Sequence, residues 1–519
     1  MGRPAATVAA GILLSRILGL IRNRVLAHYL GTSAAADAFN AAFKIPNFLQ
    51  NLFGEGVLSA SFIPAYSRLL SQGDRDDARR MAAAVGSLLA LGTAVVVLLG
   101  ILITPALVTI FTPGFEGEKR EATIRLVRIL FPGSGLLVLS AWCLGVLNSH
   151  GRFFLSYAAP VLWNLAIIGT LLASGDEAAG YRLTQLAAWG AVAGSALQLG
   201  VQLAPVLRLL GRVAPFARRG IEAARFVVRN AIPVFIGRGV VQISAYVDTV
   251  LASLLPTGAV AAVSYAQVLY TLPVSLFGMS VSAAELPAMS RARGEQAEIA
   301  EQLRARLARA LRQIAFFVVP SAVAFFALGD VIVAALYQTG AFSRNMTVYV
   351  WGILAGSSIG LLASTWGRLY SSTFYALQDT RTPLRFAVTR VVLSILLGYL
   401  FAVPLPGVLG LEQRWGAVGL TVASSLAAWT EFLLLRRVLS GRIGSTRLPG
   451  GLLARLWGSA AAATIAGAVV KLALELRHPL VVALFSLGIY GIAYFAITAE
   501  LGVAESRRIL GRFRLPRRG

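Results

Sequence analysis

Cysteine, histidine, lysine and acidic residues are all scarce in this chain of 519 residues. The single cysteine, Cys143, excludes an internal disulfide. The three histidines lie far apart, and no spacing typical of a metal site is present. Only 13% of the residues are charged, about half the share in an ordinary soluble domain. These absences exclude a secreted disulfide scaffold and a soluble protein of ordinary composition.

Catalytic patterns are missing as well. We find no Ser–His–Asp set, no paired catalytic carboxylates and no metal motif in the sequence. No Walker-type glycine loop occurs, so direct use of ATP is not expected. The sequence therefore predicts a protein that is not an enzyme and that binds no metal or cofactor. Any energy source would be an ion gradient or the membrane potential.

Apolar residues dominate what remains. They make up 57% of the chain, and the mean hydropathy is +0.73. A membrane-spanning helix needs about 20 mostly apolar residues. Fourteen segments meet this requirement: 5–29, 37–66, 80–111, 122–147, 154–173, 182–207, 226–254, 259–289, 307–328, 346–376, 384–403, 416–435, 453–472 and 480–503. The sequence predicts an all-α polytopic membrane protein with about 14 transmembrane helices.

The basic residues predict the orientation of these spans. With the N-terminus in the cytoplasm, the cytoplasmic connections and the two termini hold 28 of the 47 basic residues, and the opposite loops hold seven. This asymmetry follows the positive-inside rule and favours an even number of spans with both termini inside. It also explains the net charge of +24 without nucleic acid. The basic tail 506–519 is expected to lie against anionic headgroups.

Two stretches of the chain resemble each other. The second span exits through Pro-Ala-Tyr-Ser-Arg at 64–68, and the eighth exits through Pro-Ala-Met-Ser-Arg at 287–291. Six spans lie in each unit, so the predicted repeat is parallel, with its axis along the membrane normal. The expected organisation is a six-helix lobe at 1–220, a second at 221–445 and two further helices at 446–505. Chance similarity of two apolar helices is the alternative.

Polar residues in these two spans share one helical face. In each span the set covers a sector of roughly 80°. Charged groups at bilayer depth usually face a cavity or each other. We therefore expect the two faces to line a hydrated cavity; a buried polar seam between helices is the alternative. The residues are Asp37, Lys44, Asn47, Asn51 and Glu55 in the first set, and Ser264, Gln267, Thr271, Ser275, Gly278, Ser282 and Glu285 in the second.

Arginines lie at membrane depth in the first span. Arg16 lies about one third of the way into the membrane, and its own helix contains no acidic residue. A guanidinium group binds phosphate through paired donors, so an anionic ligand would suit Arg16. A structural pair with Asp37 or Glu55 is the alternative interpretation.

The first two spans contain a set of specific motifs. They are Ser15-Arg16-Ile17-Leu18-Gly19 with Arg22, Asp37-Ala38-Phe39, Phe43-Lys44-Ile45-Pro46-Asn47, Phe53-Gly54-Glu55-Gly56 with Ser59, and Phe62-Ile63-Pro64. With these motifs the sequence resembles the MurJ (MviN) lipid II flippase family of the multidrug/oligosaccharidyl-lipid/polysaccharide exporter superfamily. The resemblance covers the whole chain, including its length and the predicted number of spans.

The resemblance implies a transporter of the bacterial inner membrane. Such proteins move lipid II, the undecaprenyl-pyrophosphate-linked peptidoglycan precursor, from the inner to the outer leaflet by alternating access. The implied partners are this lipid-linked glycan, the membrane and peptidoglycan-synthesis proteins, without nucleic acid. Flipping of another polyprenyl-linked glycan, cation-coupled drug export and a membrane scaffold are the alternatives. The family's substrate-binding positions fall on Arg16, Arg22, Asp37, Lys44, Asn47 and Glu55.

The eighth span departs from the family pattern. Gln267 and Val268 stand where the family often has an acidic residue and an arginine, and Gln50 replaces an arginine of span 2. Gln267 and Thr271 remain candidate substrate-binding residues. We expect Arg238 to supply the missing charge, with insertion into the cytoplasmic headgroups as the alternative. Asp248 would then pair with Arg390 or with a cation.

Overall fold

The computed structural model describes residues 3–51, 58, 62–211, 246–291, 295–474 and 477–513. Within these ranges the chain forms helices and turns and no strand, which confirms the all-α class. The chain divides into two compact units, Met1–Ala261 and Ala262–Gly519. This division lies later than the predicted lobe boundary at 220. The lobe boundaries stay a prediction, because residues 212–245 are outside the described ranges.

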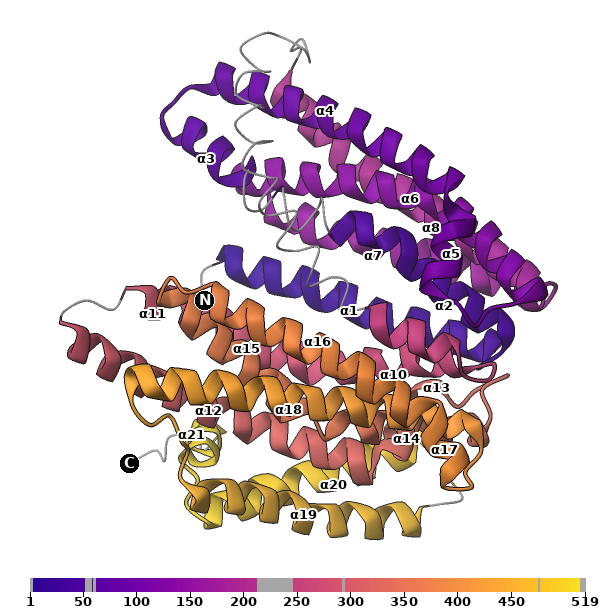
Figure 1. Cartoon of the computed structure of the whole chain (residues 1–519). Coiled ribbons are helices and arrows are strands. Elements are labelled where there is room, and N and C mark those ends of the chain that lie inside the picture. The colour runs from indigo at the N-terminus through magenta and orange to yellow at the C-terminus, as the bar shows by residue number, and fades with distance from the viewer. Residues whose placement is uncertain are drawn as a thin grey trace. The chain divides into compact units, whose positions relative to one another are not determined.

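The first unit is a bundle of long helices joined by short turns (Figure 1). Helix α6 packs against α2, α4 and α8, and α7 packs against α1 and α8. The helices are α1 (Arg3–Leu30), α2 (Ala34–Leu49), α3 (Ile63–Ser71), α4 (Arg75–Leu102), α5 (Thr104–Phe111), α6 (Gly117–Ser149), α7 (Phe153–Ser174) and α8 (Gly180–Leu210). Residues 246–253 are also helical and belong to this unit.

Helix α10 (Ala259–Pro273) begins in the first unit and continues into the second, where the π-helical segment η2 (Val274–Met279) and α11 (Ser280–Ser290) extend it. The second unit also contains α12 (Gln296–Ala327), α13 (Gly329–Tyr337), α14 (Arg344–Ser358), α15 (Leu361–Ala376), α16 (Arg381–Ala402), α17 (Pro404–Val408), η3 (Gln413–Trp415), α18 (Gly416–Ile443), α19 (Gly450–Ala473), α20 (Pro479–Glu500) and α21 (Ala504–Phe513).

Ten helices of the described ranges are long and apolar enough to cross a membrane. The bent pair α14 and α15, which meet at 42°, makes an eleventh span if the two are counted together. The other predicted spans are 5–29, 37–66 and 226–254. The first carries several arginines in α1, and the other two run partly through residues that the structure does not describe. The count of fourteen therefore stays a prediction.

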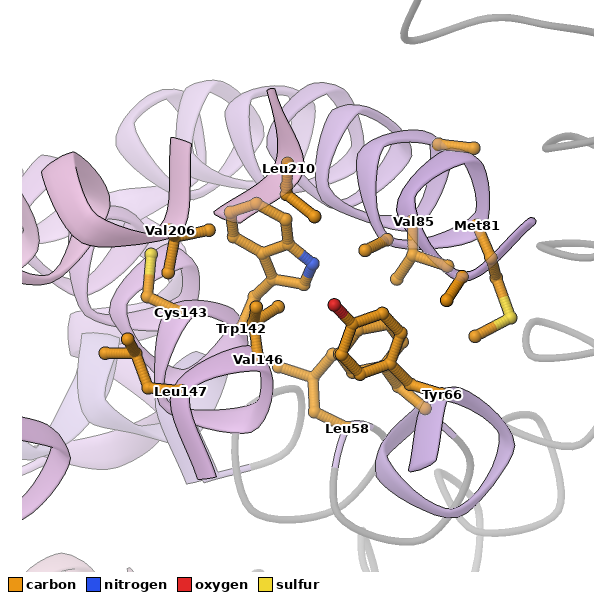
Figure 2. Close-up of a cluster of buried hydrophobic side chains, with 14 of the residues drawn as sticks. Leu58, Tyr66, Met81, Val85, Trp142, Cys143, Val146, Leu147, Val206 and Leu210 are labelled. Carbon is orange, nitrogen blue, oxygen red and sulfur yellow. The ribbon is translucent and has the colours of Figure 1, made fainter. Parts of the chain in front are cut away.

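A cluster of apolar side chains holds the first unit together near α3. The rings of Tyr66 and Trp142 lie among Val85, Val206 and neighbouring aliphatic residues, all of them buried (Figure 2). Gly86 permits this packing, because a Cβ there would lie 2.6 Å from the Trp142 ring. Small residues at such contacts let helices approach closely, which is how packing in a membrane gains its van der Waals energy.

Buried polar groups add a second connection between α6, α7 and α8. Ser140 donates a hydrogen bond to Gln202, and Gln198 donates one to Ser140 at 2.9 Å. Gln202 in turn donates to the carbonyl oxygen of Ser156. Hydrogen bonds of this kind between helices stabilise membrane bundles, by about 0.6 kcal/mol each on average.

The two spans that resemble each other in sequence share a local irregularity. Pro46 of α2 is followed by π-helical residues at 50 and 51, and Pro273 of α10 is followed directly by η2. A proline removes one backbone donor, and π-turns are often found at functional sites. This similarity supports the predicted repeat, which remains a prediction.

The last two spans, α19 and α20, pack against other helices of the second unit. Helices α19 and α20 contact each other, α19 contacts α12, and α20 contacts α13. Two tyrosines of α20 donate hydrogen bonds to carbonyl oxygens of α12: Tyr490 to Pro320 and Tyr494 to Phe316, both at 2.7 Å. Pro320 has no N–H, so the carbonyl oxygen of Phe316 lacks its usual helical donor, and the Tyr494 hydroxyl satisfies it.

Candidate functional site

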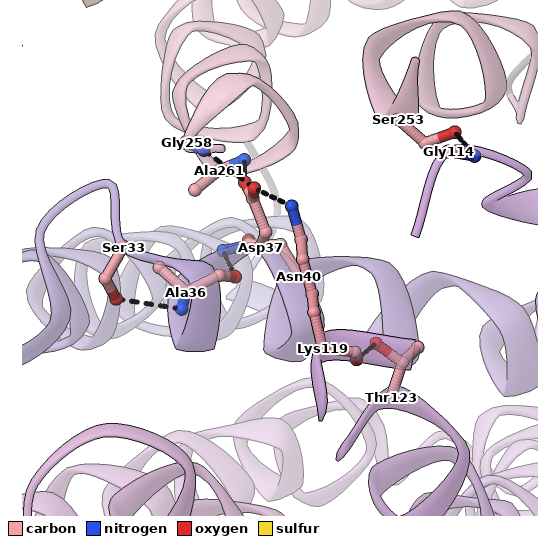
Figure 3. A network of polar contacts seen from close by, with 10 residues as sticks. All are labelled: Ser33, Ala36, Asp37, Asn40, Gly114, Lys119, Thr123, Ser253, Gly258 and Ala261. Carbon is pink, nitrogen blue, oxygen red and sulfur yellow. Dashed lines mark hydrogen bonds and ion pairs between the residues drawn. The ribbon is translucent and has the colours of Figure 1, made fainter. Parts of the chain in front are cut away.

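Among the predicted site residues that the structure describes, Asp37 in the first turn of α2 is the most buried, with 1% of its surface exposed. One of its carboxylate oxygens accepts hydrogen bonds from Lys119 of α6 at 2.6 Å and from the backbone N–H of Gly258 at 2.7 Å. The other accepts from the N–H of Ala261 at 2.8 Å. Figure 3 shows this network.

The carboxylate therefore caps the N-terminus of α10. Side-chain oxygens at this position satisfy N–H groups that lack a partner within the helix, and a negative charge there is favoured by the helix dipole. The Asp37 oxygens contact Lys119 and two backbone donors of α10, so this side chain joins α2, α6 and α10. Its expected contact with substrate stays a prediction.

Lys44 lies two turns further along α2 and is half-buried. Its ammonium group donates a hydrogen bond to the hydroxyl of Thr249 at 2.8 Å, and its charge interacts with that of Asp248. Tyr246 donates to the carbonyl oxygen of Lys44 at 3.1 Å. These contacts join α2 to the helical segment 246–253.

Arg390 of α16, one of the two partners expected for Asp248, donates to Glu431 of α18 at 3.1 Å, inside the second unit. The expected pairing of Asp248 with Arg390 or with a cation stays a prediction. Our sequence reasoning overlooked Glu431, which lies 41 residues after Arg390. The only available signal was its position as an acidic residue inside an apolar span.

Arg22 of α1 is placed by aromatic rings. Its guanidinium carbon lies 5.0 Å from the centre of the Trp163 ring and 5.8 Å from that of Phe43. A cation over a ring face is attracted by about 0.5–2 kcal/mol, the higher values applying where water is excluded. These contacts place the predicted site residue Arg22 of α1 against Phe43 of α2 and Trp163 of α7. The sequence did not identify Trp163.

A cavity of about 60 Å³ adjoins these rings in the first unit. Phe43 and Trp163 form part of its wall, and Asn47 and Gln50 of the same α2 face line it too. The predicted polar face of α2 therefore meets open space at Asn47. The side-chain amides of Asn47 and Gln50 in the cavity wall are hydrogen-bond donors, and the Trp163 ring that contacts Arg22 belongs to the same wall.

Other predicted residues are found at the surface of their helices. Arg16 of α1 is exposed. Gln267 and Thr271, one turn apart on α10, are exposed as well, and the Gln267 amide donates to the Thr271 hydroxyl at 3.4 Å. Lys119 contacts the Asp37 carboxylate, and the alternative pairing of Arg16 with Asp37 or Glu55 stays a prediction. Glu55 and Arg238 lie outside the described residues.

Arg368 of α15 is a further exposed cation that the sequence analysis did not select as a site residue. Its charge interacts with those of Arg390 and Glu431 and with the Tyr270 side chain. Two arginines and one glutamate leave this group with an excess positive charge. Among the described residues no group of three or more His, Cys, Asp or Glu side chains that could hold a metal ion is found.

Comparison with known proteins places this geometry in a family. A sequence model described as "Lipid II flippase MurJ" matches residues 26–491. A probable lipid II flippase MurJ of Rhizobium meliloti (strain 1021) is 32% identical over 446 residues, covering 84% of this chain and 80% of that relative. A lipid II flippase MurJ of Burkholderia cenocepacia is 31% identical over 444 residues, covering 84% of each.

Solved structures agree on the fold. A lipid II flippase MurJ in an inward closed conformation superposes with a TM-score of 0.78 at 23% identity, covering 97% of this chain and 99% of that one. An inward-facing multidrug resistance MATE family transporter of the MOP superfamily superposes with a TM-score of 0.64 at 19% identity, covering 82% and 95%. At these identities the likeness concerns the fold alone.

Proposed function

The chain belongs to the lipid II flippase MurJ family, and from this premise we propose that it moves lipid II from the inner to the outer leaflet of the bacterial inner membrane. The substrate carries a pyrophosphate and a sugar–peptide headgroup that cannot cross an apolar bundle unaided. Transport by alternating access requires no chemical reaction, in line with the absence of a catalytic pattern from the sequence. The family match, at about 30% identity over most of the chain, favours this substrate over the other glycans and drugs.

The observation that carries the proposal is the environment of Arg22. A guanidinium group held on two aromatic rings, beside a cavity that contains the Asn47 amide, offers a fixed set of donors at membrane depth. Arginine recognises phosphate oxygens through paired, planar donors. Because both rings orient the group in advance, less side-chain freedom is lost when the anion binds.

Arg16 is the second proposed pyrophosphate ligand. It lies six residues before Arg22 on α1, and its side chain is exposed. In the second unit, Gln267 and Thr271 would contact the uncharged parts of the headgroup, and Arg368 adds a positive charge. Arg238 and Glu55 keep the substrate-binding roles that the sequence predicts for them.

Asp37 and Lys44 have a different place in this proposal. Their charged groups are bound to Lys119, to backbone N–H groups of α10 and to Thr249. Both residues would fix the helices that present Arg22 and Asn47. They would influence transport through the position of α2.

The proposal also covers topology and partners. Both termini would lie in the cytoplasm, as the distribution of basic residues predicts. The two six-helix lobes, the C-terminal pair of helices and the basic tail keep their predicted boundaries. The lipid tail would lie in an apolar groove beside the last two spans, and proteins of peptidoglycan synthesis would be the neighbours in the membrane. An ion gradient or the membrane potential would drive the cycle.

The experiment is a transport assay in cells depleted of their own flippase. The chain should restore growth and make lipid II accessible to an enzyme added outside the cells that cleaves it. Restored drug efflux with no gain in accessible lipid II would contradict the proposal and favour the drug-exporter alternative.

A further inference from the structure

A larger cavity lies wholly within the second unit, where α12, α15, α18 and α19 meet the loop after α18. Its volume is about 200 Å³. A cavity of about 150 Å³ is enough to hold a benzene ring. The apolar wall includes Leu311, Trp366, Phe432 and Leu453, and two arginines, Arg436 and Arg447, also line the cavity. None of these six residues is among the headgroup-binding residues proposed above.

The wall of this cavity is held in place by its own contacts. The indole of Trp366 donates to the carbonyl oxygen of Leu311 at 3.2 Å, and its ring centre lies 5.3 Å from that of Phe432. The hydroxyl of Tyr370 donates to Thr446 at 2.8 Å and so ties the loop after α18 to α15. The space is therefore preformed, which lowers the cost of binding.

The charged residues that line the cavity are both positive. Arg436 is half-buried and Arg447 is exposed, and among the described residues neither has a carboxylate within ion-pair distance. The nearby Arg442, in contrast, pairs with Asp379 at 2.8 Å. A half-buried guanidinium without a counterion is unfavourable, since removing a charge from water costs free energy that only an anion or hydrogen bonds can offset. The site therefore favours an anion attached to an apolar group.

The position of the cavity indicates which class of ligand it can bind. It lies where α18 ends at Ile443 and α19 begins at Gly450, at the predicted cytoplasmic ends of these spans. Basic pockets between transmembrane helices on that side of a membrane are suited to anionic headgroups. A membrane lipid also supplies the apolar part that the wall requires.

We propose that this cavity binds an anionic glycerophospholipid. Its phosphodiester contacts the guanidinium groups of Arg436 and Arg447, and one acyl chain lies against Leu311 and Leu453. The lipid fills the space beside Trp366 and connects α18 to the first turn of α19. It is a resident lipid, distinct from the transported substrate.

The test is native mass spectrometry of the purified full-length protein, titrated in detergent with phosphatidylglycerol or with phosphatidylcholine. We expect the wild-type protein to retain one phosphatidylglycerol in preference to phosphatidylcholine. The double variant Arg436→Gln/Arg447→Gln should bind it about thirtyfold more weakly, which corresponds to about 1 kcal/mol for each arginine near an anionic headgroup.

The matched control is Arg437→Gln/Arg381→Gln, which removes the same charge from the same predicted side without altering the cavity lining. It should bind like the wild type. Leu453→Trp, which fills the cavity and keeps both arginines, should also lose the lipid. Equal loss in the control, equal retention of phosphatidylcholine, or full displacement of the lipid by inorganic phosphate would each overturn the proposal.

Discussion

The ammonium nitrogen of Lys119 in α6 lies 2.6 Å from a carboxylate oxygen of Asp37 in α2, and only 1% of the Asp37 surface is exposed. Lys119 also lies over the Phe115 ring, at 4.0 Å from its centre. Together with the N-terminal N–H groups of α10, this pair joins helices that are more than 80 residues apart in sequence. Asp37 and Phe43, one of the rings beside Arg22, both belong to α2.

Removing one partner of this pair should destabilise the protein strongly. Asp37→Asn keeps the shape of the side chain but leaves Lys119 without its counterion. Breaking a buried ion pair in this way costs about 3–5 kcal/mol. We expect a clear fall in the thermal unfolding temperature in detergent. Asp76→Asn serves as a control, because its pair with Arg79 is exposed and contributes about 0–1 kcal/mol. A similar, small effect of both changes would show that the buried pair is not important.

Substitution of Arg16 should affect transport and leave folding intact. The exposed guanidinium of Arg16 makes no large contribution to the packed core, so Arg16→Ala should insert and unfold like the wild type. It should fail to restore growth of a flippase-depleted strain. Arg16→Lys should restore little, because a single ammonium lacks the paired donors. Full complementation by Arg16→Ala would falsify the role of this residue in substrate binding.

The exposed face of α10 can be tested by thiol labelling. Cys143 is fully buried, so a Cys143→Ala background removes the only native thiol. Gln267→Cys and Thr271→Cys should react with a membrane-impermeant thiol reagent, because both positions are exposed and polar. Val263→Cys, at a buried position of the same helix, should stay unlabelled. Protection at 267 and 271 in every condition would mean that this face contacts lipid or protein instead of water.

His150 should make stability depend on pH near neutrality. Its ring accepts from or donates to the Tyr66 hydroxyl at 2.9 Å, just after the end of α6. Burial, followed by the charges of Arg152, Arg75 and Arg79, lowers the pKa of His150 below its usual value of about 6.5.

The direction of this effect follows from proton linkage. The unfolded chain binds the proton more readily than the folded one, so stability decreases as the pH falls below about 6.5. We expect the unfolding temperature to drop between pH 7.5 and pH 5.5, and His150→Gln to reduce this drop. An unchanged pH profile in the variant would assign the dependence to other groups.

Local patterns in the sequence were sufficient to predict the fold class of the protein. The hydropathy of a span is a sum over about 20 consecutive residues, so it does not depend on what the segment packs against. For this reason the apolar helices could be predicted before any contact was known, and ten of them appear in the described residues. The motif around Arg16, Arg22 and Lys44 likewise led to the correct family, because it is contiguous in the chain.

The partners of the buried charges could be found only in the tertiary structure. Lys44 lies beside Thr249, and Arg390 beside Glu431, at separations that no periodicity encodes. Helical phase places a residue on a face, but the rotation and depth of the neighbouring helix decide which group meets it. Asp37 illustrates this difference. From the sequence alone, Asp37 is a charge within the membrane, which is energetically costly. In the tertiary structure it contacts Lys119 and caps the N-terminus of α10, and these contacts stabilise the first unit.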